Sequence, residues 1–130
     1  MAPNEHKETF IKINIEKSNE ALEVAQESID KNRLTTALNR IYYAVFYTVN
    51  ALAIKHDFTT AKHSKMMGWF NQKFIYENKI FDKELSKIYQ NIFMFRQKGD
   101  YDEEYPIDIE RAKELLAEAK IFIEAVRKVI

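Results

Sequence analysis

The near absence of helix-stopping residues is the feature that most constrains how this 130-residue chain can fold. The sequence contains two glycines and two prolines. Because glycine and proline supply most turns, a chain with so few of them favours a few long helices over many short strands. No internal repeat, low-complexity tract or linker divides the sequence. We therefore expect one domain over residues 1–130, an all-α, up-and-down helical bundle of about five helices.

Apolar residues recur at gaps of three and four in five segments, which is the spacing that lines one face of a helix. Asp82 and Asp108 precede two of these segments and are suited to cap their first turns. The expected helices cover about Glu5–Asp30, Arg33–His56, His63–Tyr76, Asp82–Gln97 and the segment from Asp108 to the C-terminus.

The same spacing predicts which faces are buried. In the fourth helix the expected face is Leu85, Ile88, Ile92 and Phe95, and Arg96 stands at its edge. In the first helix the expected face consists of Ile11, Ile15, Ser18, Leu22, Ala25 and Ile29.

The second helix is apolar around most of its girth, which is typical of a central, nearly enclosed helix. One side is mixed and carries Arg33, Thr36, Arg40, Tyr43 and Tyr47 at gaps of three and four. An arginine among tyrosines can bind phosphate beside a surface on which bases stack. It can equally be held by tyrosine hydroxyls and a carboxylate of a neighbouring helix, and the sequence leaves both hypotheses open.

Composition excludes several functional classes. There is no cysteine, so thiolate–zinc and thiol redox chemistry are excluded. The chain shows neither the apolar run of a signal peptide nor the roughly 20 apolar residues of a membrane span, and a cytoplasmic protein without membrane contact is expected. His6, His56 and His63 lack metal-ligand spacing, and two glycines cannot build a phosphate loop. No metal site and no cofactor are expected.

Charge is unevenly distributed although it sums to zero. Residues 31–75 carry seven basic residues and one acid, a net of +6, and lie between two segments that each have a net of −4. Such a basic block can attract an anionic ligand. It can equally meet the acidic segments within one fold or across a dimer.

Two further residues are candidates for chemistry. Arg96 has a guanidinium suited to grip phosphate by two parallel hydrogen bonds. Alternatively, it is an arginine near a helix C-terminus whose stem covers apolar surface. His63 begins the third helix, where the helix dipole disfavours the imidazolium, so its imidazole should be neutral and able to accept a proton. A capping or packing role is the alternative for His63.

The regular pattern breaks in FRQKGDYDEEYP, residues 95–106. Gly99 and Pro106 bracket the expected exit from the fourth helix after Gln97. The four acids between them lack the spacing of a calcium loop, and a solvated loop is the simpler interpretation. The negative charge of these acids disfavours the binding of a polyanion unless basic groups such as Arg40 and Lys62 offset it. Alternatively, the acids hold arginines in ion pairs.

Three strings carry a resemblance to a known family. They are NRIYYAVFYTVNALAIKHDF (39–58), KHSKMMGWFNQKFI (62–75) and FRQKGDYD (95–102). In order and spacing, over about residues 15–128, they resemble the HEPN superfamily, and within it the small stand-alone branch with a Tyr-Tyr-Ala helix, a downstream His and an Arg-x-x-x-Asp-Tyr segment. The resemblance implies a helical-bundle homodimer in which the ends of the fourth helices meet at a shared cleft.

Many HEPN proteins are metal-independent endoribonucleases, often toxins paired with a small nucleotidyltransferase antitoxin, and others bind nucleotides or serve as partner subunits. Their ribonuclease motif is an arginine followed, after four to six residues, by a histidine. Arg96 matches the arginine, but the positions for the histidine hold Tyr101, Asp102 and Glu103. Tyrosine, with a pKa near 10, is a poor base at neutral pH, and His63 can substitute only if it folds beside Arg96.

Three hypotheses follow. The leading one is a non-catalytic or weakly catalytic HEPN protein that binds a nucleotide, RNA or a nucleotidyltransferase partner, with His63 as a secondary polar contact. The second is a toxin-type, metal-independent endoribonuclease in which Arg96 works with Tyr101 or His63. The third is a structural dimer subunit without a ligand site. In the leading hypothesis the ligand site consists of Arg40, Tyr43, Arg96, Asp100 and Tyr101.

Overall fold

The computed structural model describes residues 3–101 and 107–130, with side chains for residues 6–98 and 107–130. Every regular element in these ranges is a helix, so the predicted all-α class is confirmed. The elements are α1 (Pro3–Asp30), α2 (Leu34–Lys55), α3 (His63–Phe70), the π-helix η1 (Asn71–Glu77), α4 (Lys83–Tyr101) and α5 (Ile109–Arg127).

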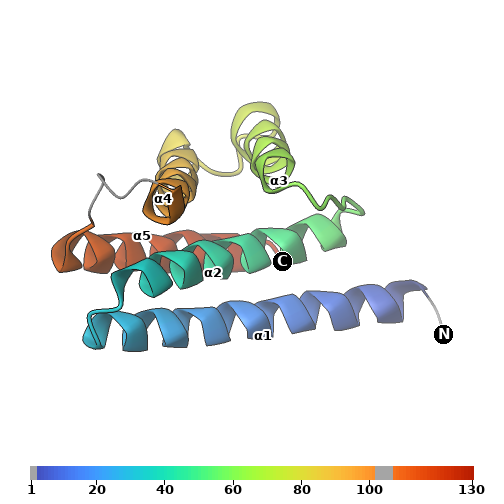
Figure 1. Cartoon of the computed structure of the whole chain (residues 1–130). Coiled ribbons are helices and arrows are strands. Elements are labelled where there is room, and N and C mark those ends of the chain that lie inside the picture. The colour runs from blue at the N-terminus through green and yellow to red at the C-terminus, as the bar shows by residue number, and fades with distance from the viewer. Residues whose placement is uncertain (1–2, 102–106) are drawn as a thin grey trace.

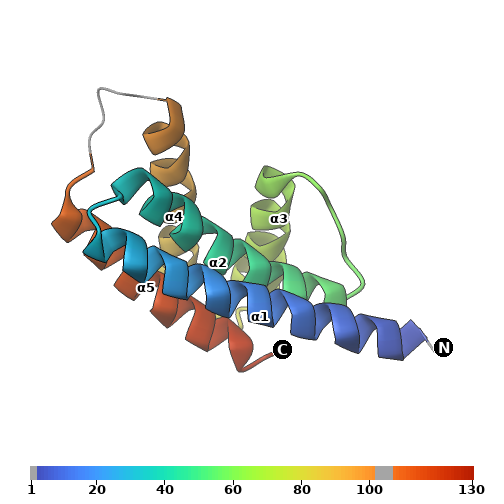
Figure 2. The ribbon, with the colours of Figure 1, turned by 60° about the horizontal axis from the view of Figure 1, so that its bottom comes forward.

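The helices form two layers. Figure 1 shows α1, α2 and α5 lying along one another, with α3 and α4 crossing this layer on the side of α2 and α5. In the turned view of Figure 2, α2 passes in front of α4 and α3, which cross it from behind. α2 contacts each of the four other α-helices, as its apolar girth predicts. Among the described residues, no helix is both long and apolar enough to cross a membrane.

The mixed side of α2 is the side that stays open. Ala37 through Ala53 supply eleven buried residues, which face α1, α5 and the crossing helices. Arg40, Tyr43 and Tyr47 are half-buried, and Arg33 and Thr36 are exposed. The stripe predicted from sequence therefore forms a surface of the central helix, partly covered by its neighbours.

The buried face of α1 is rotated from the predicted one. Ser18, Ala25 and Ile29 are buried as expected, but the predicted core residues Ile11, Ile15 and Leu22 are only half-buried. The other buried members of this face are Asn14, Ala21 and Ser28.

Polar contacts with α2 explain this rotation. The Ser18 hydroxyl donates to the Ala44 carbonyl oxygen at 2.8 Å and lies 2.8 Å from the Thr48 hydroxyl. The Asn50 amide donates to Asn14 Oδ1 at 3.0 Å. A pattern that counts apolar residues misses a face on which buried polar groups satisfy one another.

The third helix was predicted as one α-helix over His63–Tyr76, and this prediction is partly wrong. The backbone is α-helical to Phe70 and continues as a π-helix over Asn71–Glu77. A π-turn closes after more residues than an α-turn, and Phe74 and Ile75 are both buried here. The wider turn therefore puts two consecutive side chains into the core.

The fourth helix was predicted to end at Gln97, and it instead continues through Gly99 to Tyr101. A glycine inside a helix costs about 1 kcal/mol relative to alanine, which lowers helix stability without ending a helix that its packing supports. Arg96 consequently lies before the last turn of α4. Two of the residues predicted for its buried face, Ile88 and Phe95, are only half-buried.

Both predicted caps are confirmed. The Asp82 carboxylate accepts the Glu84 backbone N–H at 3.0 Å, and the Asp108 carboxylate accepts the Arg111 backbone N–H at 2.8 Å. Each bond satisfies a backbone donor that the first turn of a helix leaves unpaired.

Candidate functional site

Arg96 lies against the open side of α2. Its guanidinium carbon is 5.0 Å from the ring centroid of Tyr42 and 5.5 Å from that of Tyr43, which are cation–π distances. Tyr42 is fully buried, whereas Tyr43 and Arg96 are half-buried. Two consecutive rings of the central helix therefore position a partly desolvated guanidinium.

His63, the first residue of α3, reaches the same two tyrosines. Its Nδ1 is 2.8 Å from the Tyr42 hydroxyl, and its ring meets the Tyr43 ring edge-on at 5.7 Å. The imidazole also stacks on Phe46, with 4.2 Å between ring centroids and 17° between planes. Because Arg96 and His63 share Tyr42 and Tyr43 as neighbours, the fold places the histidine beside the arginine.

The surroundings of His63 and Tyr42 shift both groups toward neutrality. Burial lowers the pKa of His63, and the positive charge of Arg96 lowers it further. Burial raises the pKa of Tyr42, and the attraction of Arg96 for a phenolate offsets only part of this. At neutral pH the imidazole is therefore biased toward its uncharged form and the phenol keeps its proton.

A second arginine approaches Tyr43 from within α2. The guanidinium carbon of Arg40 is 5.1 Å from the Tyr43 centroid, and its Nε and Nη2 donate to Asn39 Oδ1 at 3.0 and 2.8 Å. Within the described part of the chain, no ion pair joins Arg40 to an acid. Among the described residues, Arg40 is held by the ring of Tyr43 and the amide of Asn39. The alternative from the sequence was that tyrosine hydroxyls and a carboxylate hold it.

The structure thus brings together four predicted site residues: Arg40, Tyr43, His63 and Arg96. The side chains of Asp100 and Tyr101 lie outside the described residues, although their backbone completes α4. The hypothesis that the acids of residues 100–104 form ion pairs with arginines also concerns side chains outside the described residues.

Tyr42 and Phe46 are site residues that were not among the candidates from the sequence. Tyr42 nevertheless supplies the hydroxyl that bonds His63, and Phe46 supplies the ring on which the imidazole stacks. A signal for Tyr42 is present in the sequence, because a tyrosine on a helix apolar around most of its girth needs a partner for its hydroxyl. The identity of that partner depends on the crossing of α3 over α2, which the spacing does not encode.

A metal has no evident place in this arrangement. Among the residues that the structure describes, no three histidines, aspartates or glutamates lie close enough to hold an ion. The chemistry available from the described side chains is that of cations, aromatic rings and one imidazole.

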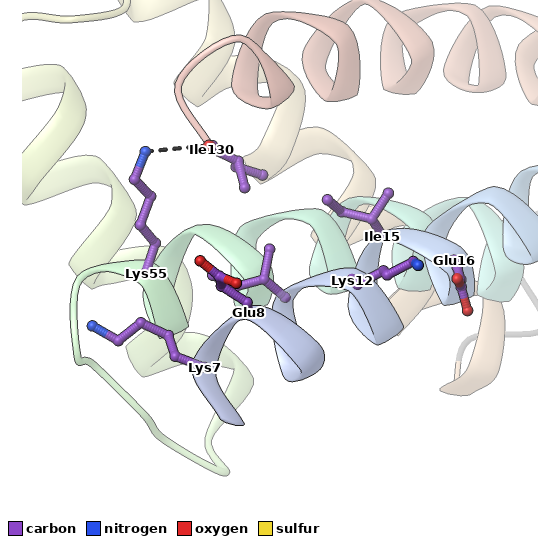
Figure 3. Close-up of a pocket in the computed structure, with 8 residues that line it drawn as sticks. Lys7, Glu8, Lys12, Ile15, Glu16, Lys55 and Ile130 are labelled. Carbon is purple, nitrogen blue, oxygen red and sulfur yellow. Dashed lines mark hydrogen bonds between the residues drawn. The ribbon is translucent and has the colours of Figure 1, made fainter. Parts of the chain in front are cut away.

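A pocket of about 650 Å³ lies along the N-terminal half of α1, away from Arg96 (Figure 3). Isoleucines and charged residues of both signs line it, and none of the residues around Arg96 does. Lys55 Nζ donates to the carbonyl oxygens of Val129 at 3.1 Å and Ile130 at 3.2 Å, while Lys7 Nζ lies 2.8 Å from Asp57 Oδ1. Two of its three lysines therefore tie chain segments together.

Fold and site together define a class: an all-α bundle whose central helix presents tyrosines to a histidine and an arginine of the crossing helices. The chain matches the HEPN domain family over residues 11–129, and it therefore belongs to that family. This confirms the resemblance found in the sequence.

Three relatives of known sequence align with most of the chain. A UPF0332 protein of Thermotoga maritima is 36% identical over 124 residues, which span 95% of this chain and 93% of the relative. A protein of Methanocaldococcus jannaschii named "Putative toxin MJ0142" is 33% identical, over 88% of this chain and 77% of its own length. A second protein of that organism, "Putative toxin MJ0605", is 27% identical over 89% and 85%.

Proposed function

We propose that this HEPN-family protein binds the phosphate groups of RNA or of a nucleotide at Arg96 and is at most a slow nuclease. The observation that carries the proposal is the position of the Arg96 guanidinium over Tyr42 and Tyr43. Rings that contact the flat face of a guanidinium fix the orientation of its plane, and a planar guanidinium matches the geometry of a phosphate. A side chain that is already positioned also loses less conformational entropy on binding.

Arg40 strengthens this proposal because it lies on the ring of Tyr43 as Arg96 does. Two guanidinium groups on one tyrosine give a local positive charge, and Arg40 and Tyr43 both belong to the basic segment of residues 31–75. Asp100 and Tyr101, whose backbone completes α4, are the other two members of the proposed site. Their roles remain predictions, as does a cytoplasmic location.

Fluorescence anisotropy with a labelled oligoribonucleotide at low salt tests the proposal. Phosphate contacts are strongest there, so the wild type should bind and Arg96→Ala should lose at least tenfold in affinity. Arg111→Ala is the matched control, because the Arg111 guanidinium lies over Phe95, 4.9 Å from its ring centroid, and forms an ion pair with Glu114. A flat titration of the wild type would favour the third hypothesis, a structural subunit without a ligand.

A second candidate function is metal-independent RNA cleavage, and the observation that favours it is the imidazole of His63 beside Arg96, with a pKa that burial and the charge of Arg96 lower. In this reaction His63 takes the proton of a ribose 2′-hydroxyl, the 2′-oxygen bonds to phosphorus, and the bond from phosphorus to the 5′-oxygen breaks. Arg96 stabilises the charge on the phosphate oxygens, the leaving 5′-oxygen takes a proton from water, and the protonated His63 returns its proton to the solvent. The products are a 2′,3′-cyclic phosphate and a 5′-hydroxyl. Two relatives that are named as putative toxins also favour this function.

The hydrogen bond between Tyr42 and His63 sets a condition on this second function. If the Tyr42 hydroxyl donates to Nδ1, then Nε2 of a neutral His63 carries the proton and cannot accept another. If Nδ1–H donates to the Tyr42 oxygen, Nε2 has a free lone pair. Cleavage by His63 at Nε2 requires the second tautomer, and ¹⁵N NMR of the imidazole distinguishes the two.

Incubation with RNA in EDTA tests cleavage directly. If His63 is the base, His63→Ala should abolish 2′,3′-cyclic phosphate products and leave binding largely intact, whereas Arg96→Ala should reduce both. His6→Ala, a histidine on an exposed position of α1, serves as the control. Equal product from wild type, Arg96→Ala and His63→Ala would rule the second function out.

We further propose that the protein forms a homodimer at the ends of α4 and that a small nucleotidyltransferase is its partner class. Met94, two residues before Arg96, is 40% exposed, which supports an apolar contact there. Light scattering on Met94→Glu should report a monomer. Ile121→Glu, at a position of α5 that is 59% exposed, is the control and should leave the dimer intact.

A further inference from the structure

We propose that the ligand is a strand of single-stranded RNA whose backbone crosses from α4 over α2 to α1, with successive phosphates at Arg96, Arg40 and Lys17. This inference rests on the phosphate-binding function proposed above and narrows its substrate class. A single nucleotide would use only the Arg96 end of the path. Lys17 is the new contact, and the sequence pattern gave no reason to single it out.

Two tyrosines join the three cations into one continuous row. Tyr43 carries Arg96 and Arg40 at 5.5 and 5.1 Å from its ring centroid. The Tyr43 and Tyr47 centroids are 5.7 Å apart, and Lys17 Nζ lies 5.6 Å from the Tyr47 centroid. Positive groups that follow one another along a surface and alternate with rings are the arrangement by which proteins track a single-stranded backbone.

The end of the row at Lys17 is hollowed. Lys17, Arg40 and Tyr47 line an open pocket of about 310 Å³, which also touches Ala21 and Val24. That volume is at the lower end of the range of small-ligand pockets and suits a phosphate with part of its ribose. Arg96 does not line this pocket, so the phosphate proposed beside Lys17 is a different one from the phosphate proposed at Arg96.

The register of α1 against α2 is fixed next to Lys17. Asn14 accepts the amide of Asn50, and the buried hydroxyls of Ser18 and Thr48 are 2.8 Å apart. These bonds hold the helices on both sides of Lys17, so its position opposite Tyr47 follows from the packing of two long helices. A site on such rigid elements holds its geometry better than one on a loop.

One acid, the exposed Glu20, lines the same pocket and allows a second test of the proposal. A carboxylate repels a phosphate that binds beside it. Replacing Glu20 by glutamine should therefore tighten strand binding. Glu16 is also exposed on α1 but lines the separate pocket of Figure 3, and Glu16→Gln is its control.

The experiment measures the affinity of 2′-O-methyl oligouridines of one to eight nucleotides, which cannot be cleaved through a 2′-hydroxyl, across a salt series. Wild-type affinity should rise with length until at least three phosphates are present. For the octamer, Lys17→Ala should reduce the slope of log K against log salt by about 0.7, the value for one lost phosphate contact on a single strand. Binding of the mononucleotide should not change. Lys12→Ala, an exposed lysine of α1 that lines the Figure 3 pocket, should behave as wild type.

The outcomes separate the two proposals. If the mononucleotide binds as tightly as the octamer, or if Lys17→Ala and Glu20→Gln match the wild type while Arg96→Ala weakens binding, the strand path is wrong and the phosphate site stands. If Arg96→Ala also binds the octamer as the wild type does, the proposed function itself fails. A length dependence that Lys17→Ala weakens and Glu20→Gln strengthens supports the path across α1.

Discussion

The Tyr42 hydroxyl lies 2.8 Å from His63 Nδ1, and this contact joins the centre of the fold to the first residue of α3. The same phenol ring lies under the Arg96 guanidinium. One fully buried tyrosine of α2 therefore sets the position of the histidine and of the arginine. A substitution of Tyr42 should therefore affect both the His63 imidazole and the Arg96 guanidinium.

Replacing Tyr42 by phenylalanine should lower the free energy of unfolding by about 1 kcal/mol, the usual net contribution of one hydrogen bond. The ring and its packing remain, so only the bond to His63 is lost. Urea unfolding followed by circular dichroism measures the effect. Tyr43→Phe is the control, because Tyr43 is only half-buried on the open side of α2. Equal stability of both variants would mean that the Tyr42 bond adds nothing.

Tyr89→Phe should have the opposite effect. The Tyr89 hydroxyl is buried and has no hydrogen-bond partner among the described residues, and burial raises the pKa of this phenol. Removing a buried polar group that lacks a partner removes its desolvation penalty, so the variant should be at least as stable as the wild type and gain up to about 1 kcal/mol. The urea midpoint reports this. A clear loss of stability would show that the hydroxyl has a partner in solution, such as a water molecule.

The pKa of His63 makes stability depend on pH in a defined direction. The folded value lies below the ordinary 6.5, so near pH 6.5 the unfolded chain holds a proton that the folded chain does not. Stability is therefore full above pH 6.5, falls as the pH is lowered through that value, and stops falling once the folded imidazole is protonated. His63→Gln should flatten this part of the stability profile. A His63→Gln profile with the same slope would assign the effect to another group.

The charge of Arg96 contributes to the lowered pKa of His63, which gives a prediction of its own. Arg96→Gln should raise the pKa of His63 toward its ordinary value, since the repelling cation is removed. An NMR titration of the imidazole Cε1–H signal follows this directly. Arg111→Gln should leave the titration unchanged, because its guanidinium lies over Phe95. An unchanged His63 titration in Arg96→Gln would show that the two side chains do not interact in solution.

The fold was predictable from the sequence to a large extent because its information is local. Gaps of three and four located the helices, and Asp82 and Asp108 marked two of their starts correctly. What local spacing could not supply was the partner of each polar group. Asn14 and Ser18 are buried because α2 offers them Asn50 and Thr48, and no count of apolar residues contains that fact.

For the site, too, the sequence predicts single residues but not the contacts between them. Arg96 and His63 were candidates for their residue type and helix position, but their meeting at Tyr42 depends on how α3 and α4 cross α2. The crossing is set by packing, including the π-turns after Phe70 that place Phe74 and Ile75 in the core. The sequence can therefore indicate each of these residues as a candidate, but only the fold shows that they meet at one ring.

The buried hydroxyl pair between α1 and α2 gives a stability prediction that a single substitution cannot test. Ser18→Ala and Thr48→Val each remove one hydroxyl of a pair 2.8 Å apart and leave the other hydroxyl with fewer partners. Each should cost about 1–3 kcal/mol, and the double variant should cost less than the sum, because no hydroxyl then remains unsatisfied. Urea unfolding of the four proteins yields the coupling energy. The matched cycle uses Ser28→Ala, whose hydroxyl donates to the Val24 carbonyl of its own helix, with Thr48→Val, and it should be additive. Additivity in both cycles would mean that Ser18 and Thr48 stabilise the α1–α2 contact independently.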